Sequence, residues 1–549
     1  MLSLGYVSLA TVVCVALSQP ESTFVNYCTP TEDCWPCAPD IRAFAATLSS
    51  PDILIDNWNE KFDLAADVGN HYLWRKPGWV VDVQTLEDVQ KAVRFGRKHR
   101  LRLSIVSSGH DFAGRNTGTA SLMINTRNMK AKRVYPADAN SPTGSSLWAE
   151  PACNMGEIFA EVDRYGLVAV GGNAHGVSVS GWTLGGGHSQ LSRKYGLGVD
   201  NVLSFEVVLA DGSVANVSAN GTYIIDANNN PVEAPDNDLW WALRGGGGST
   251  FAVMTALHIK LFPAATGYVS TFLTYPIWGE NMYWLDEPVN NTGEQVLDFF
   301  YKDLLWRLPD TWGGYVMIYT GPVDLTWLYP GYSQLGSVQF TLFHYGPWEE
   351  AMNGLQPLID FHPEWRLAND LFNFSTYLEM NEGGVNDILN GNTYIVNRLH
   401  QEEYLKAGAI TEVYKNYIQD FDEDSFQFSC TLAHLGHATV TPGPEDTSIS
   451  PELRKAYISN SCGTAWGAGE TGDYQRLAIK DFDSNFLQQA GDGVYYNEPD
   501  TDLVNWKSDF WGSNYARLAE IKQRYDPDGY FRCSHCVGSD VPFTGITIP

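Results

Sequence analysis

The sequence predicts an α+β protein, with α/β units in its first half and an antiparallel sheet covered by helices in its second half. In the first half, β-branched runs at Val80–Val83 and Leu103–Val106 flank an amphipathic helical pattern over residues 86–93, as in a strand–helix–strand unit. In the second half, apolar and polar residues alternate and aromatic residues are frequent, for example over residues 314–320 and 337–344. That alternation is typical of antiparallel strands with one covered face.

Further elements follow from local patterns in chain order. Thr85 with Asp88 predicts a capping box at the start of the first helix. Asp211-Gly212 predicts a hairpin turn between two alternating runs. Helical patterns cover residues 156–165, 239–243, 393–421 and 512–525.

The length and charge of the chain limit its class. The 549 residues are enough for two or three domains with a substantial core. A net charge of −29 repels nucleic acids and anionic membrane surfaces, so neither is expected as a partner.

The N-terminus resembles a secretory signal peptide. The apolar run from Leu4 to Leu17 is too short to span a bilayer, and Ala16-Leu17-Ser18 has the form of a cleavage site. Loss of residues 1–18 would remove Cys14 from the 9 cysteines and leave an even number, which suits disulfides in an oxidising compartment. The pairing is open, and Cys533-Ser-His-Cys536 could instead be half of a zinc knuckle, although no metal is expected. Four glycosylation sequons also favour an extracellular protein; they begin at Asn216, Asn220, Asn290 and Asn373.

Four glycine-rich loops lie in the first half of the chain; the first two follow β-branched runs, and the last follows a helix-like run. They lie at residues 107–111, 171–173, 185–189 and 245–248. Glycines at strand ends let the backbone approach a bulky ligand and direct N–H groups toward it. The spacing matches neither a P-loop nor a dinucleotide-binding fingerprint. These loops alone therefore predict only that a large ligand is bound.

Taken in order, the motifs resemble FAD-linked oxidases of the p-cresol methylhydroxylase / vanillyl-alcohol oxidase (PCMH/VAO) type, in the branch with a berberine-bridge-enzyme-like C-terminus. The resemblance covers about Trp74 to Ser539, and the closest subgroup is the fungal-type secreted alcohol oxidases. It rests on residues 107–115, 181–189, 194–201, 242–248 and 495–498, with 524–529.

The resemblance implies a PCMH-type FAD-binding domain of two α/β subdomains and a substrate-binding domain. The implied organisation is a signal peptide at 1–18, a cysteine-bearing N-terminal lead-in at 19–72, the FAD-binding domain at 73–266, the substrate-binding domain at 267–480 and a C-terminal segment at 481–540 that returns to the FAD domain.

The resemblance also implies that FAD is held by one covalent bond, from His110 to the flavin 8α-methyl group. A neutral imidazole nitrogen can form that bond, which would retain the cofactor outside the cell. Ala174 stands where relatives carry a second, cysteinyl link, so a single link is expected. Val177 corresponds to a small gate residue beside the flavin, which favours O2 as the electron acceptor. The other expected FAD contacts are Ser107, Ser108, Gly109, Asp111, Gly114, Gly185, Gly186, Gly187, Asp200, Asn201, Val207, Gly245, Gly247 and Asn497.

The implied chemistry is hydride transfer from a substrate C–H bond to the flavin, while a base takes the hydroxyl proton. His188 is the first candidate for the base, because imidazole titrates near neutrality. Tyr496 and Glu498 are the next candidates. If residues 495–498 form a strand, only one of Tyr495 and Tyr496 can face the flavin.

The leading hypothesis is a secreted oxidase that converts an alcohol or a sugar hydroxyl and reduces O2 to H2O2. One alternative is a flavin-dependent oxidative cyclase or desaturase of specialised metabolism. Another is an inactive acidic extracellular matrix protein that keeps the fold. The small-molecule partner is expected to be an alcohol or a carbohydrate, and the sequence leaves the oligomeric state open.

Overall fold

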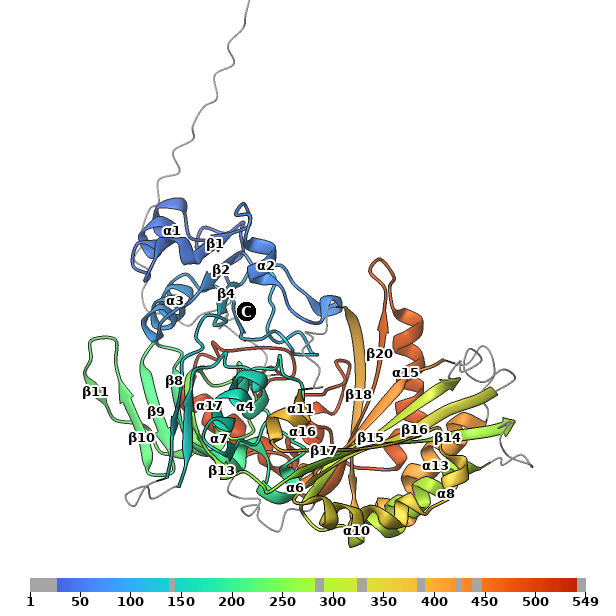
Figure 1. Cartoon of the computed structure of the whole chain (residues 1–549). Coiled ribbons are helices and arrows are strands. Elements are labelled where there is room, and N and C mark those ends of the chain that lie inside the picture. The colour runs from blue at the N-terminus through green and yellow to red at the C-terminus, as the bar shows by residue number, and fades with distance from the viewer. Residues whose placement is uncertain are drawn as a thin grey trace, which may run out of the picture.

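The computed structural model describes residues 27–137, 144–281, 291–322, 333–382, 391–419, 426–436 and 447–540 (Figure 1). The predicted signal peptide lies outside these residues. Within them, no helix is both long and apolar enough to cross a membrane. Three sheets of four or more strands organise the chain, and they lie in the N-terminal, central and C-terminal parts of the fold.

The first sheet has the strand order β1-β2-β4-β3, and β2, β4 and β3 run parallel. The predicted capping box is confirmed, because the Thr85 hydroxyl and the Asp88 carboxylate each accept a backbone N–H from the other residue. The lead-in at 19–72 supplies β1 and two helices, although its sequence shows no clear period. The elements are α1 (Ala38–Ala45), β1 (Leu54–Asp56), α2 (Phe62–Ala66), β2 (Trp79–Asp82), α3 (Leu86–Lys98), β3 (Leu103–Val106) and β4 (Leu122–Asn125).

The second sheet has seven strands in the order β11-β10-β9-β8-β12-β6-β5, all antiparallel. The predicted turn at Asp211-Gly212 joins β8 to β9, and Gly212 takes a φ of +82° there. Because its neighbouring strands pair antiparallel, this subdomain differs from the α/β pattern expected for it. The strands are β5 (Lys132–Tyr135), β6 (Ser146–Ala149), β8 (Val202–Val208), β9 (Val214–Ser218), β10 (Gly221–Ile225), β11 (Pro231–Val232) and β12 (Val253–Lys260).

Short helices lie beside this second sheet and carry the glycine-rich loops. A separate two-stranded ladder joins β7 (Leu167–Val168) to β13 (Phe262–Pro263). The helices are α4 (Met155–Asp163), α5 (Val179–Leu184), α6 (Ser192–Tyr195) and α7 (Asp238–Leu243). The helix expected over 156–165 and the helix expected over 239–243 are therefore confirmed.

The third sheet confirms the predicted antiparallel substrate domain. Its seven strands have the order β17-β14-β16-β15-β19-β20-β18, and all pairs are antiparallel. They are β14 (Tyr268–Asn281), β15 (Trp312–Pro322), β16 (Ser333–Tyr345), β17 (Ala368–Phe374), β18 (Asn392–Gln401), β19 (Ser429–His434) and β20 (Ala456–Trp466).

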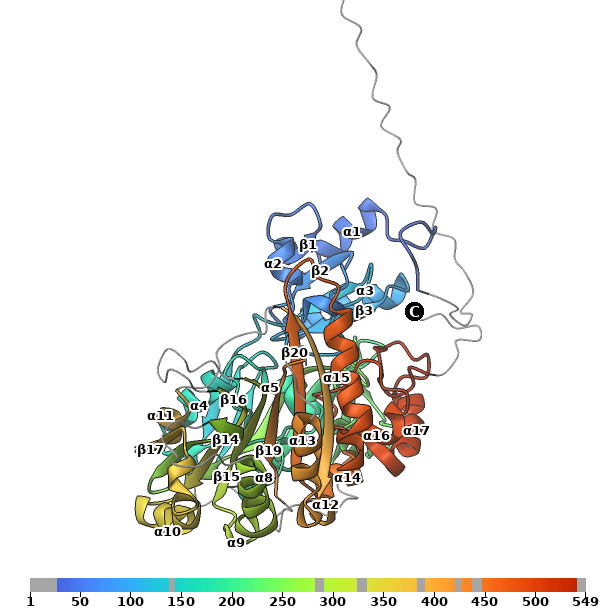
Figure 2. The same ribbon diagram turned by 90° about the vertical axis from the view of Figure 1, so that its right-hand side faces the viewer.

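Helices cover one face of the third sheet, as Figure 2 shows for α8, α13 and α15. The helix expected over 393–421 is wrong in its first part, because residues 392–401 form β18 and α12 begins only at Glu402. The helices of this domain are α8 (Thr292–Asp298), α9 (Leu305–Arg307), α10 (Trp348–Ile359), α11 (Tyr377–Asn381), α12 (Glu402–Ala407), α13 (Ala409–Gln419), α14 (Pro451–Lys455) and α15 (Asp473–Asn485).

The two faces of the third sheet differ in character. Val316 and Ile318 are fully buried against the covering helices, in a core of aliphatic and aromatic side chains. Tyr315, Met317 and Tyr319 alternate with them and are only partly buried. The face without helices therefore presents aromatic and polar side chains.

The C-terminal segment returns to the second sheet, where α17 (Tyr515–Tyr525) lies beside α7 and follows α16 (Trp506–Trp511) (Figure 1). The predicted boundary at 480/481 falls inside α15. The buried Lys522 ammonium fixes the segment by donating to the carbonyls of Thr250 and Phe531 and to the Asp526 carboxylate.

Three disulfides lie within the described residues: Cys28–Cys34, Cys430–Cys462 and Cys533–Cys536. The last pairing rules out the zinc-knuckle alternative, since both sulfur atoms are already bonded to each other. Cys153 is a free, buried thiol, and burial raises its pKa to about 11.

Candidate active site

The first glycine-rich loop places His110 at the end of β3. Gly109 takes a φ of +88°, and its carbonyl accepts the Gly69 N–H. Burial, together with the nearby charge of Arg127, lowers the pKa of His110 to about 4. Nε2 of His110 is buried and has no hydrogen-bond partner in the described part of the chain. The side chain is therefore a neutral imidazole with an unused ring nitrogen.

Serine hydroxyls join this first loop to the segment that contains Val177. Ser107 Oγ lies 2.6 Å from Ser178 Oγ. The Ser180 hydroxyl donates to Ser107 Oγ over 2.9 Å. The backbone N–H of Ser178 donates to Ser108 Oγ. Both serines predicted to contact the cofactor thus use their hydroxyls to hold two loops together, which leaves their backbone groups as the possible cofactor contacts.

The C-terminal segment contacts the third glycine-rich loop, residues 185–189, through hydrogen bonds and close packing. The N–H groups of Gly187 and His188 donate to the Tyr495 hydroxyl over 3.0 and 3.2 Å. The Asn497 amide lies against Gly185, where a Cβ atom would fall 1.9 Å from Asn497 Oδ1. Asn497 also donates to the Trp182 carbonyl. Glycine at position 185 is therefore needed for the C-terminal segment to pack on this loop.

His188 and Glu498 are brought together across 310 positions of sequence. Nε2 of His188 lies 2.8 Å from Oε1 of Glu498, and Ser461 of β20 donates its hydroxyl proton to the other carboxylate oxygen. Burial would raise the pKa of Glu498, but the charge and hydrogen bond of His188 and the Ser461 hydroxyl outweigh it, so that pKa lies below its usual value. Glu498 is therefore a carboxylate that can stabilise a positive charge on His188.

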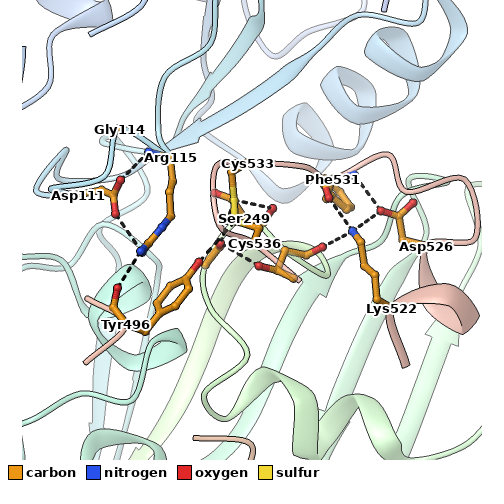
Figure 3. The surroundings of a disulfide bond; sticks show 12 residues. Asp111, Gly114, Arg115, Ser249, Tyr496, Lys522, Asp526, Phe531, Cys533 and Cys536 are labelled. Carbon is orange, nitrogen blue, oxygen red and sulfur yellow. Dashed lines mark hydrogen bonds and ion pairs between the residues drawn. A yellow bond between two sulfur atoms is a disulfide. The ribbon is translucent and has the colours of Figure 1, made fainter. Parts of the chain in front are cut away.

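Tyr496 lies apart from this pair. Its ring packs under Gly247, where a Cβ atom would fall 2.4 Å from the ring, and it stacks 3.7 Å from the Arg115 guanidinium. Figure 3 shows Arg115 between Asp111 and Tyr496, with the Tyr496 hydroxyl directed toward the Cys533–Cys536 disulfide, whose Cys536 Sγ lies 3.5 Å away. The structure thus directs Tyr495, not Tyr496, to the His188 loop, and residues 495–498 form a turn rather than a strand.

Other predicted cofactor residues serve the loops themselves. Both Asp200 carboxylate oxygens accept from the Arg454 guanidinium, over 2.7 and 2.5 Å, in a buried pair that joins the FAD domain to α14. Asn201 donates to two carbonyls of the preceding turn. Val207 is fully buried between β9 and β12, so the structure places it in the core rather than on a pocket surface.

The remaining predicted glycines line close approaches between segments. Gly186, with a φ of +123°, has the Tyr495 ring beside it. Gly245 is crowded by Ile449, and its carbonyl accepts the Trp511 indole N–H. Gly114 packs on Leu73.

Sequence reasoning missed Ser461, Tyr315 and Arg454. Ser461 and Tyr315 lie in strands of the third sheet, on the face that carries no helices. Burial raises the pKa of the Tyr315 phenol, and the charges of Tyr377 and Glu498 raise it further. No local motif marks these residues; only the alternation of β15 indicates that Tyr315 faces away from the core.

The residues present fit a bound FAD. His110 supplies a neutral, buried nitrogen without a partner in the described residues, which is the state that attachment to a flavin methyl group requires. The glycine-rich loops bring Gly109, Gly187 and Gly247 into backbone conformations with φ values of +88°, +76° and +92°. Because glycine has no Cβ atom, these loops let the backbone come close to a bulky ligand.

Comparisons with known proteins support an FAD-binding chain. The family described as "FAD binding domain" matches residues 77–218, and the family "Berberine and berberine like" matches residues 494–538. The chain is 30% identical to the VAO-type flavoprotein oxidase VAO615 of Thermothelomyces thermophilus, over 85% of this chain and 76% of that protein.

Solved structures share the fold. The VAO-type flavoprotein MtVAO615 of Myceliophthora thermophila C1 superposes with a TM-score of 0.74 at 23% identity, covering 94% of this chain and 98% of that one. The xylooligosaccharide oxidase of the same organism, solved with xylobiose, gives a TM-score of 0.70 at 19% identity, covering 91% and 99%. The chain thus belongs to the VAO-type, berberine-bridge-like flavoproteins and is an FAD-dependent oxidoreductase.

Proposed function

We propose that this protein is a secreted oxidase that takes a hydride from the hydroxyl-bearing carbon of an alcohol or a sugar and reduces O2 to H2O2. The observation that carries the proposal is the pairing of His188 with Glu498 beside the open face of the third sheet. An oxidase of alcohols needs a proton acceptor at this point, since loss of hydride from the carbon must be matched by loss of the hydroxyl proton.

His110 would hold FAD through a covalent bond from Nε2, with the loops at 107–111 and 185–188 on either side. When bound, FAD accepts the hydride and passes two electrons to O2. Val177 belongs to the segment held by Ser107 and Ser108, and its small side chain would leave room for O2 beside the flavin.

His188 would act as the base. If its Nε2–H donates to Glu498, the lone pair lies on Nδ1, a buried nitrogen that has no partner in the described residues and would take the hydroxyl proton of a substrate that contacts it. The Glu498 carboxylate then stabilises the imidazolium that forms, and Ser461 holds that carboxylate in place. Tyr496 is too deeply buried under Gly247 for this role.

The open face of the third sheet would contact the substrate. Tyr315, Met317 and Tyr319 of β15 lie opposite Thr341, Gln339 and Ser337 of β16, so aromatic rings lie beside hydrogen-bonding groups. Sugars bind well to such surfaces, because their C–H faces pack on aromatic rings while their hydroxyls need polar partners. The fold shared with a xylooligosaccharide oxidase supports a carbohydrate or alcohol substrate.

Two observations support secretion. Three disulfides are formed within the described residues, and such bonds persist in oxidising compartments. Asn216, Asn220 and Asn373, each the first residue of a sequon, are exposed, whereas Asn290 lies outside the described residues.

The test is oxygen consumption with peroxide detection, on protein secreted by a eukaryotic host and supplied with primary alcohols, secondary alcohols or neutral oligosaccharides. The proposal expects one H2O2 per O2 consumed with at least one of these classes. If none of these compounds reduces the flavin under anaerobic conditions, and a ring-closing or desaturation substrate is turned over, the cyclase or desaturase alternative is favoured.

A further inference from the structure

The aromatic side chain of Tyr223 is exposed on the outer face of the second sheet. Tyr223, in β10, is 65% exposed, whereas its neighbour Ile224 is only 6% exposed. The ring leans along the strand, because a Cβ atom on Gly221 would fall 3.5 Å from it. One flat face of the ring is therefore supported by the strand, and the other is open to solvent.

A glycosylation sequon lies directly opposite this ring. Asn216 of β9 pairs with Tyr223 of β10 in the antiparallel ladder, so both side chains lie on the same face of the sheet. Directly opposite residues have Cβ atoms about 5 Å apart. Asn216 is exposed and begins the sequence Asn-Val-Ser218. An attached sugar would therefore begin within reach of the ring.

We propose that Asn216 and Tyr223 form an N-glycan platform, in which the first N-acetylglucosamine on Asn216 packs its C–H face against the Tyr223 ring. A secretory glycosyltransferase would form the bond between Asn216 Nδ2 and the anomeric carbon, with loss of an amide proton and release of the lipid diphosphate that carried the oligosaccharide. The packing covers apolar area on both partners, which stabilises the glycosylated fold. The inference rests on the proposed secretion and is independent of the oxidase reaction.

The other described sequons lack this arrangement. Asn373 of β17 lies opposite Val269 of β14, which is completely buried. Asn220 lies in the tight turn between β9 and β10, where its N–H donates to Ser218 Oγ. Asn216 is thus the one sequon asparagine of the described residues that faces an exposed ring across a strand pair.

The position of the hairpin suits a glycan. Figure 1 shows β9, β10 and β11 at the outer edge of the second sheet, on the far side of the molecule from the strands and helices of the third sheet. A glycan on this edge leaves the His188–Glu498 site open.

The experiment is a double-mutant cycle on protein secreted by a eukaryotic host. Site occupancy is read by glycopeptide mass spectrometry, and the melting temperature is measured for wild type, N216Q, Y223A and the double variant. We expect Asn216 to be occupied, Y223A to lower the melting temperature by about 2 °C in glycosylated protein, and the same substitution to have no effect in the N216Q background. The matched controls are N373Q, at a sequon without this partner, and Y165A, at an exposed ring without it. The effects of these two substitutions on the melting temperature are expected to add in their double variant.

A second readout does not depend on stability. The aromatic ring current should shift proton resonances of the first sugar upfield in NMR spectra, and Y223A should abolish the shift. An unoccupied Asn216, an additive cycle or unshifted sugar resonances would each overturn the platform. Turnover assays on the same samples separate the two proposals, since N216Q is expected to leave turnover unchanged whatever substrate is found.

Discussion

Nε2 of His188 lies 2.8 Å from Oε1 of Glu498, although 310 positions of sequence separate the two residues. The contact joins the FAD domain to the C-terminal segment. Ser461 of the substrate domain donates a hydrogen bond to the same carboxylate. The proposed proton acceptor therefore forms only when all three parts of the chain are folded together.

Glu498→Gln should lower kcat/KM by about 100-fold with unchanged flavin content, because glutamine keeps a hydrogen bond but supplies no negative charge to a protonated His188. Steady-state peroxide production measures the effect. Ser461→Ala keeps the charge and should cost less than about tenfold. Wild-type turnover in the Glu498 variant would remove the carboxylate from the mechanism.

Arg454→Ala should lower the free energy of unfolding by about 3 kcal/mol, since it leaves the Asp200 carboxylate buried without its partner. Denaturant unfolding measures this cost. Arg517→Ala breaks an exposed pair with Asp238 and is the matched control, with an expected cost below about 1 kcal/mol. Equal costs for the two variants would contradict the interpretation of the Asp200–Arg454 pair as a buried tie between domains.

Tyr495→Phe should destabilise the His188 loop by about 2 kcal/mol, because two backbone N–H groups lose their acceptor. Hydrogen exchange at residues 187 and 188 should become faster in the variant. Tyr165→Phe, at an exposed tyrosine, should change neither stability nor exchange. Unchanged protection of the two amides would show that the phenol does not hold the loop.

Stability should fall as the pH falls from about 6.5 to about 4, because several histidines are folded in the neutral form. Burial lowers the pKa of His344 and of His400 to about 4, and that of His434 to about 3. In this range the unfolded chain binds more protons than the folded chain. Each such histidine therefore adds about 1.4 kcal/mol per pH unit to the slope of the unfolding free energy against pH.

Unfolding free energies measured between pH 4 and 7 test this statement. His434→Gln should reduce the slope near pH 5 by about 1 kcal/mol per pH unit. An unchanged slope in the His434 variant would mean that this residue does not titrate between the two states.

Local sequence patterns were sufficient for elements whose signals are local. The capping box at Thr85, the turn at Gly212 and the alternation in β15 each follow from a few neighbouring residues. The pattern over 393–421 does not separate β18 from the helices that follow, because residues 396–401 of β18 are all buried and show no period of two.

Part of the site can also be predicted from sequence, because some of its residues lie in local motifs. His110 and His188 lie in glycine-rich loops that can be recognised from sequence, and Glu498 follows a tyrosine–asparagine pair. Ser461, Tyr315 and Arg454 have no such context, since their roles come from contacts between strands and domains far apart in the chain. The roles of Tyr495 and Tyr496 follow only from the turn at 495–498, which directs Tyr495 to the His188 loop and Tyr496 to Gly247.

The most direct test of the central claim is the mass of the tryptic peptide that contains His110, measured after acid denaturation of protein produced with FAD. The account predicts that this peptide carries the flavin and fluoresces, and that His110→Ala releases the flavin into the supernatant while the protein remains folded. Complete release of flavin from the denatured wild-type chain would contradict covalent attachment through His110.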